Sequence, residues 1–419
     1  MNILYVLHKN PNISLGGVER HIKDLSTTIS LKGFNVYILY PSHSHLELAL
    51  FKDGGIQLLK MKCASIKNFS KFKDLRDKDI EELFKKILDN YLIDVVHFQH
   101  ILGLPLSLFE IAKSSGAKVF ITIHDYYLWC QNYKLLRRFD GDMRFCYFED
   151  NSDICVDCIR DTFKSIVSRE YIKERREYAK KLLNICDCII TPSKYLKGVI
   201  INLFNVDEKK IKIIEHGITH PNDLYFRNCK DKNTMNIGYL GAFTFEKGAH
   251  IFLRFVDEAK RLGLNRYVSF YIIGELGFDI PNNYCKNNCL KIIGSYKPED
   301  VNRLLNENSI DVVLLLSIWP ETYSYTLSEA IANKIPVIAT DLGALRQRIS
   351  EYSSGFLVPY EKPLIYIFDI IQDFLKHPEI LDYFSKRCEA VSKVLPDISD
   401  MSDRYVGLYK NMHLTKFKN

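Results

Sequence analysis

The chain has 419 residues, 47% of them hydrophobic, which is too many for one ordinary core and enough for two domains. Its formal net charge of +6 suits an anionic partner such as a nucleotide diphosphate or a membrane surface, although a solvated basic face explains it equally well. No basic and aromatic block marks a nucleic-acid interface, and eleven cysteines without a signal-peptide pattern argue against a secreted disulfide framework. We therefore expect a cytoplasmic protein, or one held peripherally on the inner face of the membrane.

Short apolar runs alternate with amphipathic segments through the first half of the chain. The pattern predicts strands at 2–7, 35–40, 94–98, 118–123 and 188–191, and helices at 17–31, 79–90, 104–114 and from 193 onward. Apolar strands separated by helices are typical of a parallel sheet that is covered on both faces. A polar stretch at 219–234 then follows, and we interpret it as an interdomain linker.

The same alternation restarts after this stretch. Strands are predicted at 236–240, 268–273, 311–316 and 336–340, and helices at 247–262 and 324–333. The sequence therefore predicts an α/β protein with two Rossmann-like domains, at 1–218 and 236–378. A cysteine-bearing insertion is expected at 126–160 and a helical tail at 379–419.

Two motifs of the first domain follow predicted strands. Gly16 and Gly17 open the first helix, where small residues and free helix amides suit an anion, although a plain strand–helix turn is equally consistent. His124 and Asp125 end a strand, at the sheet edge where open α/β folds bind ligands. The imidazole could hydrogen-bond a sugar hydroxyl or a phosphate, whereas a core histidine is the alternative. His8, His97 and His100 also lie at strand ends, and for them the core role is favoured more strongly.

The second domain has a comparable strand–loop–helix motif from Gly238 to Gly248. Gly241 lies in its loop, and Lys247 is expected at the start of the following helix. A cation there opposes the helix dipole, so an anionic ligand is a better explanation for Lys247 than a structural role. The motif predicts a diphosphate site.

The most specific motif runs from Trp319 to Ala330 and contains Glu321 and Glu329, with seven residues between them. A strand precedes Glu321 and carries it to the carboxyl edge of the sheet, while Glu329 lies in an apolar stretch that a solvated glutamate would not favour. Carboxylates accept hydrogen bonds from vicinal diols of a ribose or hexose. The amides that open the next helix could meet phosphate oxygens, and they belong to Tyr323, Ser324, Tyr325 and Thr326.

Together these motifs resemble those of the retaining family 4 glycosyltransferases, which have the GT-B fold. The resemblance covers roughly residues 1–360 and rests on the two glutamates and the segment after them, with support from earlier motifs in the same order. The matching residues are Gly16-Gly17, His124-Asp125, Ser193, His216-Gly217-Ile218, Lys247-Gly248, Glu321-x7-Glu329 and 336–343.

The resemblance implies two Rossmann-like domains facing across a cleft, and a hexose moved from a nucleotide-diphosphate sugar to a glycan or lipid-linked acceptor. It implies that Glu321 and His124 contact the donor sugar, that Glu329 holds the ribose, and that Lys247 neutralises the leaving diphosphate. Gly16 and Gly17 would let the first domain close over the donor. No metal or other cofactor is implied for catalysis, and cell-surface polysaccharide synthesis is the expected setting.

The chain departs from the family pattern at two places. The arginine that often accompanies the lysine is replaced by Ala242, and the usually glycine-rich loop after Glu321 carries Thr322 and Ser324. The missing cation leaves open a catalytically silent nucleotide-sugar-binding subunit. A sugar-nucleotide epimerase of the same fold is another alternative.

Four cysteines gather in the expected insertion, at positions 130, 146, 155 and 158. Cys130, Cys146, Cys155 and Cys158 have a spacing that fits a structural zinc site, with unrelated thiols or a redox-active pair as alternatives. A basic stretch at 60–78, with Phe69 and Phe72 interleaved, would suit a membrane surface or a solvated loop.

Overall fold

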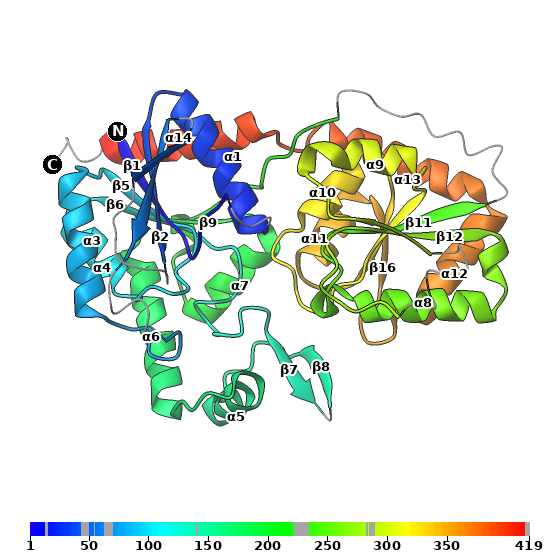
Figure 1. Cartoon of the computed structure of the whole chain (residues 1–419), viewed down its shortest axis with the longest axis horizontal. Coiled ribbons are helices and arrows are strands. Elements are labelled where there is room, and N and C mark those ends of the chain that lie inside the picture. The colour runs from blue at the N-terminus through cyan, green and yellow to red at the C-terminus, as the bar shows by residue number, and fades with distance from the viewer. Residues whose placement is uncertain are drawn as a thin grey trace. The chain divides into compact units, whose positions relative to one another are not determined.

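The structure is a computed structural model that describes residues 1–12, 16–42, 50–53, 55–62, 70–139, 141–221, 234–281, 284 and 290–414. It divides into two compact units, which Figure 1 shows with their elements labelled. Unit 1 comprises Met1–Gly217 and Ile398–Asn419, and unit 2 comprises Ile218–Asp397. Most of the expected linker, residues 222–233, lies outside the described residues.

Unit 1 is built on an eight-stranded sheet in the order β10-β9-β6-β5-β1-β2-β4-β3. Its strands are parallel except for the β3–β4 pair, and the central ones are buried along their whole length, which explains their continuous apolar sequences. The strands are β1 (Asn2–Val6), β2 (Asn35–Pro41), β3 (Leu50–Asp53), β4 (Ile56–Met61), β5 (Val95–Phe98), β6 (Lys118–Thr122), β9 (Cys188–Thr191) and β10 (Ile211–Ile213).

Helices cover this sheet, and two of them begin after a residue whose side chain caps the helix. Asp77 and Ser193 cap α3 and α7, each accepting a hydrogen bond from the backbone amide three residues later. The helices are α1 (Gly17–Leu31), α3 (Lys78–Asn90), α4 (Leu108–Ser114), α6 (Arg169–Ile185), α7 (Lys194–Phe204) and α14 (Ile398–Leu414), with a short 3-10 turn at Glu208–Lys210.

The last helix, α14, is part of unit 1 although the whole of unit 2 precedes it in the chain. Met401, Tyr405 and Tyr409 are fully buried in the same core as β1, and α14 lies beside α1 (Figure 1). The Tyr409 hydroxyl meets Nδ1 of His97 at 2.6 Å. The core of unit 1 is therefore completed by the end of the chain.

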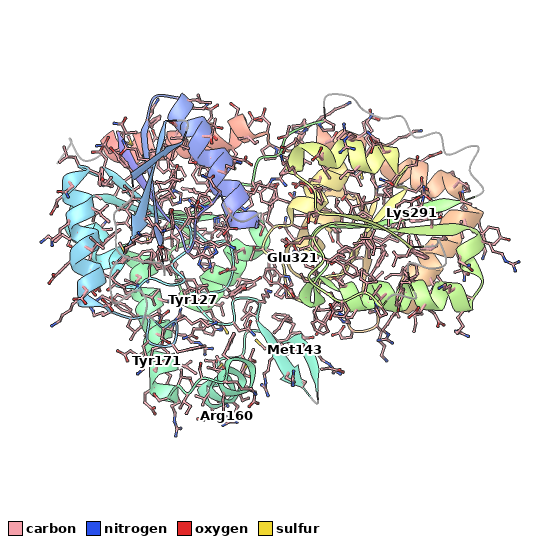
Figure 2. All side chains as sticks on the ribbon, viewed as in Figure 1. Tyr127, Met143, Arg160, Tyr171, Lys291 and Glu321 are labelled. Carbon is pink, nitrogen blue, oxygen red and sulfur yellow. The ribbon has the colours of Figure 1, made fainter. Side chains whose placement is uncertain are left out.

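The insertion after β6 forms a small hairpin and a helix that project from the sheet of this unit (Figure 1). It consists of β7 (Leu136–Phe139) paired antiparallel with β8 (Asp142–Phe145), followed by α5 (Ser152–Phe163). A buried ion pair anchors its base, since the Arg175 guanidinium contacts Asp74 at 3.0 Å and also donates to the carbonyl of Leu128. The hydroxyls of Tyr127 and Tyr171, labelled in Figure 2, donate to the same Asp74 carboxylate.

Unit 2 has a six-stranded parallel sheet in the order β13-β12-β11-β14-β15-β16. The strands are β11 (Met235–Leu240), β12 (Val268–Ile273), β13 (Leu290–Gly294), β14 (Val312–Leu315), β15 (Val337–Thr340) and β16 (Gly355–Val358). The helices are α8 (Ala249–Arg261), α9 (Val301–Glu307), α10 (Tyr325–Ala332), α11 (Gly343–Tyr352), α12 (Pro363–Lys376) and α13 (Pro378–Ser392), with 3-10 turns at Phe245–Lys247, Leu264–Arg266 and Pro298–Asp300. This is the strand order of a dinucleotide-binding Rossmann sheet.

Two sequence predictions need correction here. The tail expected at 379–419 is divided, because Cys388 and Val391 of α13 pack into the core of unit 2, and only α14 belongs to unit 1. Lys247 does not open the long helix but ends a 3-10 turn, and Gly248 in left-handed conformation separates it from α8.

Two further structural findings bear on the expected membrane contact. None of the described helices is long and apolar enough to cross a bilayer. Phe72 is half-buried and packs against the ring of Phe163 within unit 1, while Phe69 lies outside the described residues.

Candidate active site

The strand order of unit 2 creates a topological switch point between β11 and β14. From β11 the chain continues to β12 on one side, whereas β14 leads to β15 on the other. The loops that leave the carboxyl ends of these two neighbouring strands therefore diverge, which is where open α/β sheets bind ligands. One loop carries Gly241 and Lys247, and the other carries Glu321, which is labelled in Figure 2.

Lys247 and Glu321 form a direct ion pair at this edge. Nζ of Lys247 lies 2.7 Å from Oε2 of Glu321, and the ammonium also lies 5.6 Å from the ring centre of Trp319. The Ser317 hydroxyl donates to the other carboxylate oxygen of Glu321. The Glu321 side chain is only 5% exposed, whereas that of Lys247 is 33% exposed. A buried carboxylate thus holds a partly accessible cation in a fixed place.

Close backbone packing holds the two loops together. A Cβ at Gly248 would stand 2.0 Å from the carbonyl oxygen of Leu316, so only glycine allows this approach. A Cβ at Gly343 would similarly stand 2.6 Å from the carbonyl carbon of Pro320. The Tyr239 hydroxyl bridges the lysine loop, with oxygen distances of 3.1 Å to the carbonyl of Ala242 and 3.0 Å to that of Lys247.

The loop between Glu321 and α10 is held from beneath by a buried arginine. Nη1 of Arg348 donates to the carbonyls of Tyr323 and Ser324, at 3.1 and 3.0 Å, and the guanidinium lies 4.0 Å from the Tyr323 ring centre. Ser324 has φ +78°, a conformation that glycine adopts more easily. The hydroxyls of Ser324 and Thr326 lie 3.1 Å apart at the start of α10.

The side chains of this loop are largely committed to packing. Tyr323 is buried under Arg348, and Tyr325 packs against the core of unit 2. What the loop can offer a ligand is therefore mainly the amides of the first turn of α10, which have no partner within the helix. Such amides bind anions.

Glu329 lies on α10, the helix that follows the Glu321 loop. Its side chain is buried, and the Tyr296 hydroxyl, from the segment after β13, donates to its Oε2 at 3.2 Å. The sequence did not single out Tyr296, Ser317 or Arg348, because each is identified only through the contact it makes.

Unit 1 has a corresponding switch point between β1 and β5. Gly16 precedes the first turn of α1 and Gly17 opens it, without a side-chain cap on the helix. His124 follows β6, and its Nε2 lies 2.8 Å from Oε1 of Gln99, which follows β5. Its ring meets that of His21 edge-on and stacks with that of His216, with centres 5.0 and 5.3 Å away. Burial lowers the pKa of His124 well below its ordinary value, so the imidazole is neutral.

Two histidine–carboxylate pairs adjoin this cluster. His8 Nε2 lies 3.1 Å from Glu19, and His100 Nε2 lies 2.9 Å from Asp125, with the two imidazole centres 4.5 Å apart. Burial alone would raise the pKa of Asp125, but the charge and hydrogen bond of His100 hold it below its ordinary value. The sequence favoured a core role for His8 and His100, which instead form ionisable pairs at the sheet edge.

His97 is different, since it is fully buried and bonded to the hydroxyls of Thr122 and Tyr409. A core role is what the sequence favoured for this residue.

Two family models match almost all of the chain. The model described as Glycosyltransferase Family 4 matches residues 15–220, and the one described as Glycosyl transferases group 1 matches residues 224–390. The chain belongs to the family 4, group 1 glycosyltransferases. The boundary between the two matches falls close to the division between units 1 and 2.

Individual relatives of this glycosyltransferase agree with that assignment. An uncharacterised 42.6 kDa protein in the cps region of Klebsiella pneumoniae is 23% identical, over 98% of this chain and all of its own. Sucrose-phosphate synthase from Thermosynechococcus elongatus shares the fold, with a TM-score of 0.72 at 14% identity over 99% of both chains. Anabaena HepE in complex with UDP-glucose has a TM-score of 0.62 at 14% identity, over 98% of this chain and all of the other. The GT-B fold expected from the sequence is confirmed.

The predicted site residues of the glycosyltransferase thus fall into two groups. Glu321, Glu329, Lys247 and Gly241 lie around one sheet edge of unit 2, together with the start of α10. Gly16, Gly17 and His124 lie at the sheet edge of unit 1. Each group is at the switch point of its own sheet.

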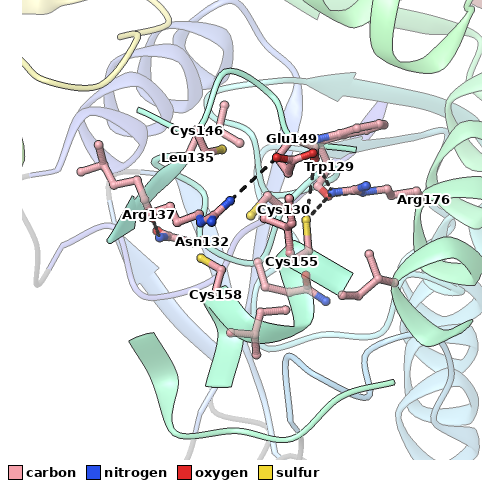
Figure 3. A pocket seen from close by; sticks show the side chains of 15 residues that line it. Trp129, Cys130, Asn132, Leu135, Arg137, Cys146, Glu149, Cys155, Cys158 and Arg176 are labelled. Atoms are coloured by element: carbon pink, nitrogen blue, oxygen red, sulfur yellow. Dashed lines mark hydrogen bonds and ion pairs between the residues drawn. The ribbon is translucent and has the colours of Figure 1, made fainter. Parts of the chain in front are cut away.

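The four cysteines of the insertion belong to neither of these groups. Cys130, Cys146, Cys155 and Cys158 all line one pocket, and none is in a disulfide (Figure 3). Burial raises the pKa of each thiol, and that of Cys130 to about 12. Within the described ranges, no three His, Cys, Asp or Glu side chains are close enough, as placed, to hold a metal ion.

Proposed function

We propose that this glycosyltransferase moves a hexose from a nucleotide-diphosphate sugar, with retention of anomeric configuration, to a glycan or lipid-linked acceptor. The observation that carries the proposal is the Lys247–Glu321 pair at the switch point of unit 2. A partly exposed ammonium beside the open end of a helix is an arrangement that suits a departing diphosphate.

The two members of the pair have complementary roles. When the glycosyl–phosphate bond breaks, positive charge develops on the sugar and negative charge on the diphosphate. Lys247 and the first amides of α10 would stabilise the diphosphate. Glu321 would accept hydrogen bonds from sugar hydroxyls while it keeps Lys247 in position, since its two oxygens also receive Ser317 and Lys247. We assign no covalent nucleophile.

Glu329 would bind the ribose hydroxyls of the donor. Its side chain is buried and accepts a hydrogen bond from the Tyr296 hydroxyl, and carboxylates also accept hydrogen bonds from vicinal diols. His124, neutral at physiological pH, would hydrogen-bond the donor sugar without adding charge. Gly16 and Gly17 would provide small backbone contacts at the start of α1.

The relatives support a role in the synthesis of cell-surface polysaccharide. The protein from Klebsiella pneumoniae that matches over nearly the whole chain comes from a cps region. UDP-glucose is bound by the fold relative from Anabaena, which makes a UDP-hexose the first donor to test.

The test has two stages. Thermal shift with UDP-, GDP- and TDP-sugars identifies the donor, and NMR of the product then reports the configuration of the new bond. We expect an axial donor to give an axial product, and Glu321→Ala to abolish transfer. Inversion of configuration would contradict the retaining mechanism, and the absence of any stabilising nucleotide sugar would contradict the donor site.

Ala242 favours one alternative, a subunit that binds the donor without transferring it. This position is exposed, so the chain lacks a second cation where one would fit. A silent subunit would be stabilised by donor but would neither transfer nor hydrolyse it above the level of Glu321→Ala. Conversion of the donor sugar without any acceptor would instead indicate an epimerase.

A further inference from the structure

The cysteine pocket brings together sulfurs from three separate elements. Cys130 follows β6, Cys146 follows the β7–β8 hairpin, and Cys155 and Cys158 lie on α5. The last two are three residues apart on a helix, so their side chains leave the same face. Figure 3 shows the four cysteines around this one pocket.

The insertion has little hydrophobic material to hold it together. On α5 only Ser152 and Ile159 are buried, and the hairpin strands are buried only at Leu136 and Phe145. The adjoining apolar cluster has only Ile159 and two other buried members among the described residues. Segments this small usually need a disulfide or a metal to be stable, and no disulfide is present among these cysteines.

Basic side chains surround the thiols. Nη2 of Arg176 donates to the sulfur of Cys155 at 3.2 Å, and its guanidinium stacks 4.1 Å from the Trp129 ring centre. The same arginine donates to the carbonyls of Glu149 and Asp150, and these contacts hold its side chain in place. Arg137 also lines the pocket and lies 3.8 Å from Glu149, which lines it too. Four thiolates around a divalent cation carry a net charge of −2, which Arg176 would partly offset.

We propose that Cys130, Cys146, Cys155 and Cys158 together bind one Zn²⁺ that locks the hairpin to α5. On binding, the four thiols release their protons to solvent and no electron is transferred. Among the described residues these thiols do not already form a metal-binding group, so binding requires their side chains to rotate about χ1 toward the ion. The site is structural, and the proposal does not depend on the transferase mechanism.

Metal analysis of the reduced, unchelated protein is the first experiment, and we expect about one zinc per chain. Titration of the metal-free protein with Co²⁺ should then give thiolate-to-cobalt charge-transfer and tetrahedral d–d absorption, which needs no variant. Chelation should lower the melting temperature of the wild type.

Cys155→Ser should reduce bound zinc to near zero and remove the effect of chelator on melting. Cys388→Ser is the matched control, because this buried thiol of unit 2 meets only backbone carbonyls, those of Ile335 and Ser354, which a serine hydroxyl can also reach. The proposal is overturned if wild type binds neither zinc nor cobalt, if Cys155→Ser retains full zinc, or if mass spectrometry of the native protein finds disulfides among the four.

Discussion

Removal of the Lys247 side chain should destabilise unit 2 as well as slow the reaction. Losing one partner of a fully buried ion pair costs about 3–5 kcal/mol. Lys247 is 33% exposed and Glu321 keeps the Ser317 hydroxyl, so we expect Lys247→Ala to cost about half of that, ~2 kcal/mol. For a unit of this size the melting temperature would fall by roughly 4–8 °C. The sequence alone does not reveal that Glu321 is the partner of Lys247.

The catalytic effect should be larger than the effect on stability. Loss of one charge partner of a developing anion usually slows turnover by about 10²–10³. We expect kcat of Lys247→Ala to fall by about that factor at saturating donor. Because position 242 is exposed, Ala242→Arg should restore part of the rate if the new side chain reaches the same oxygens.

Two further variants separate the two effects. In Lys247→Ala/Glu321→Gln the buried charge is gone, so this double variant should be more stable than Lys247→Ala, by urea unfolding, yet remain inactive. Lys334→Ala is the matched control, since Lys334 pairs with Glu389 at 2.8 Å in the same unit, away from the carboxyl edge of the sheet. Its transfer rate should be normal. A folded Lys247→Ala protein with near-normal turnover would refute our assignment of the leaving-group site.

Three other predictions concern the scaffold of the two sites. Ser324→Gly should stabilise unit 2 by about 1 kcal/mol in urea unfolding, because it relieves a φ of +78°, and any loss of stability would contradict this. Gly248→Ala should lower the free energy of unfolding by about 3 kcal/mol or more, because the added Cβ would stand 2.0 Å from a carbonyl oxygen. Gly263→Ala, with φ +73° but open space around it, should lower it by only about 1 kcal/mol. Equal losses in the two variants would show that packing is not the cause. Burial lowers the pKa of His21 to about 3, so the folded state excludes a proton that the unfolded state binds below about pH 6.5. As the pH is lowered from 6.5 to 3, this residue should therefore reduce the free energy of unfolding by up to about 1.4 kcal/mol per pH unit. An unchanged slope of stability against pH in His21→Gln would refute its contribution.

The central strands and the motifs that follow them could be predicted from the sequence. Strands such as β14 and β15 are buried on both faces, so their residues form continuous apolar runs. The edge and insertion strands were missed for the converse reason. In β7, β8 and β16 exposed and half-buried positions alternate irregularly, and no clear period is left in the sequence.

The candidate site of unit 2 was predicted in its members but not in their contacts. That Lys247 reaches Glu321 depends on β11 and β14 being neighbours, although residues 241–311 lie between them in the chain, and strand order is not visible in local sequence. The same is true of Tyr296 and Arg348, ordinary residues in the sequence that support Glu329 and the loop after Glu321 only through the fold.

The place of α14 bears on how the chain is made. Unit 2 is a continuous segment, Ile218–Asp397, and every residue it needs has been synthesised before Ile398 is added. Unit 1 begins first but lacks Met401, Tyr405 and Tyr409 of its own core until the final residues emerge from the ribosome. We therefore expect the second unit to reach its native state before the first, against the usual N-to-C order of domain folding. A nascent chain stalled near residue 397 would carry an apolar face on unit 1 that only the last helix can cover.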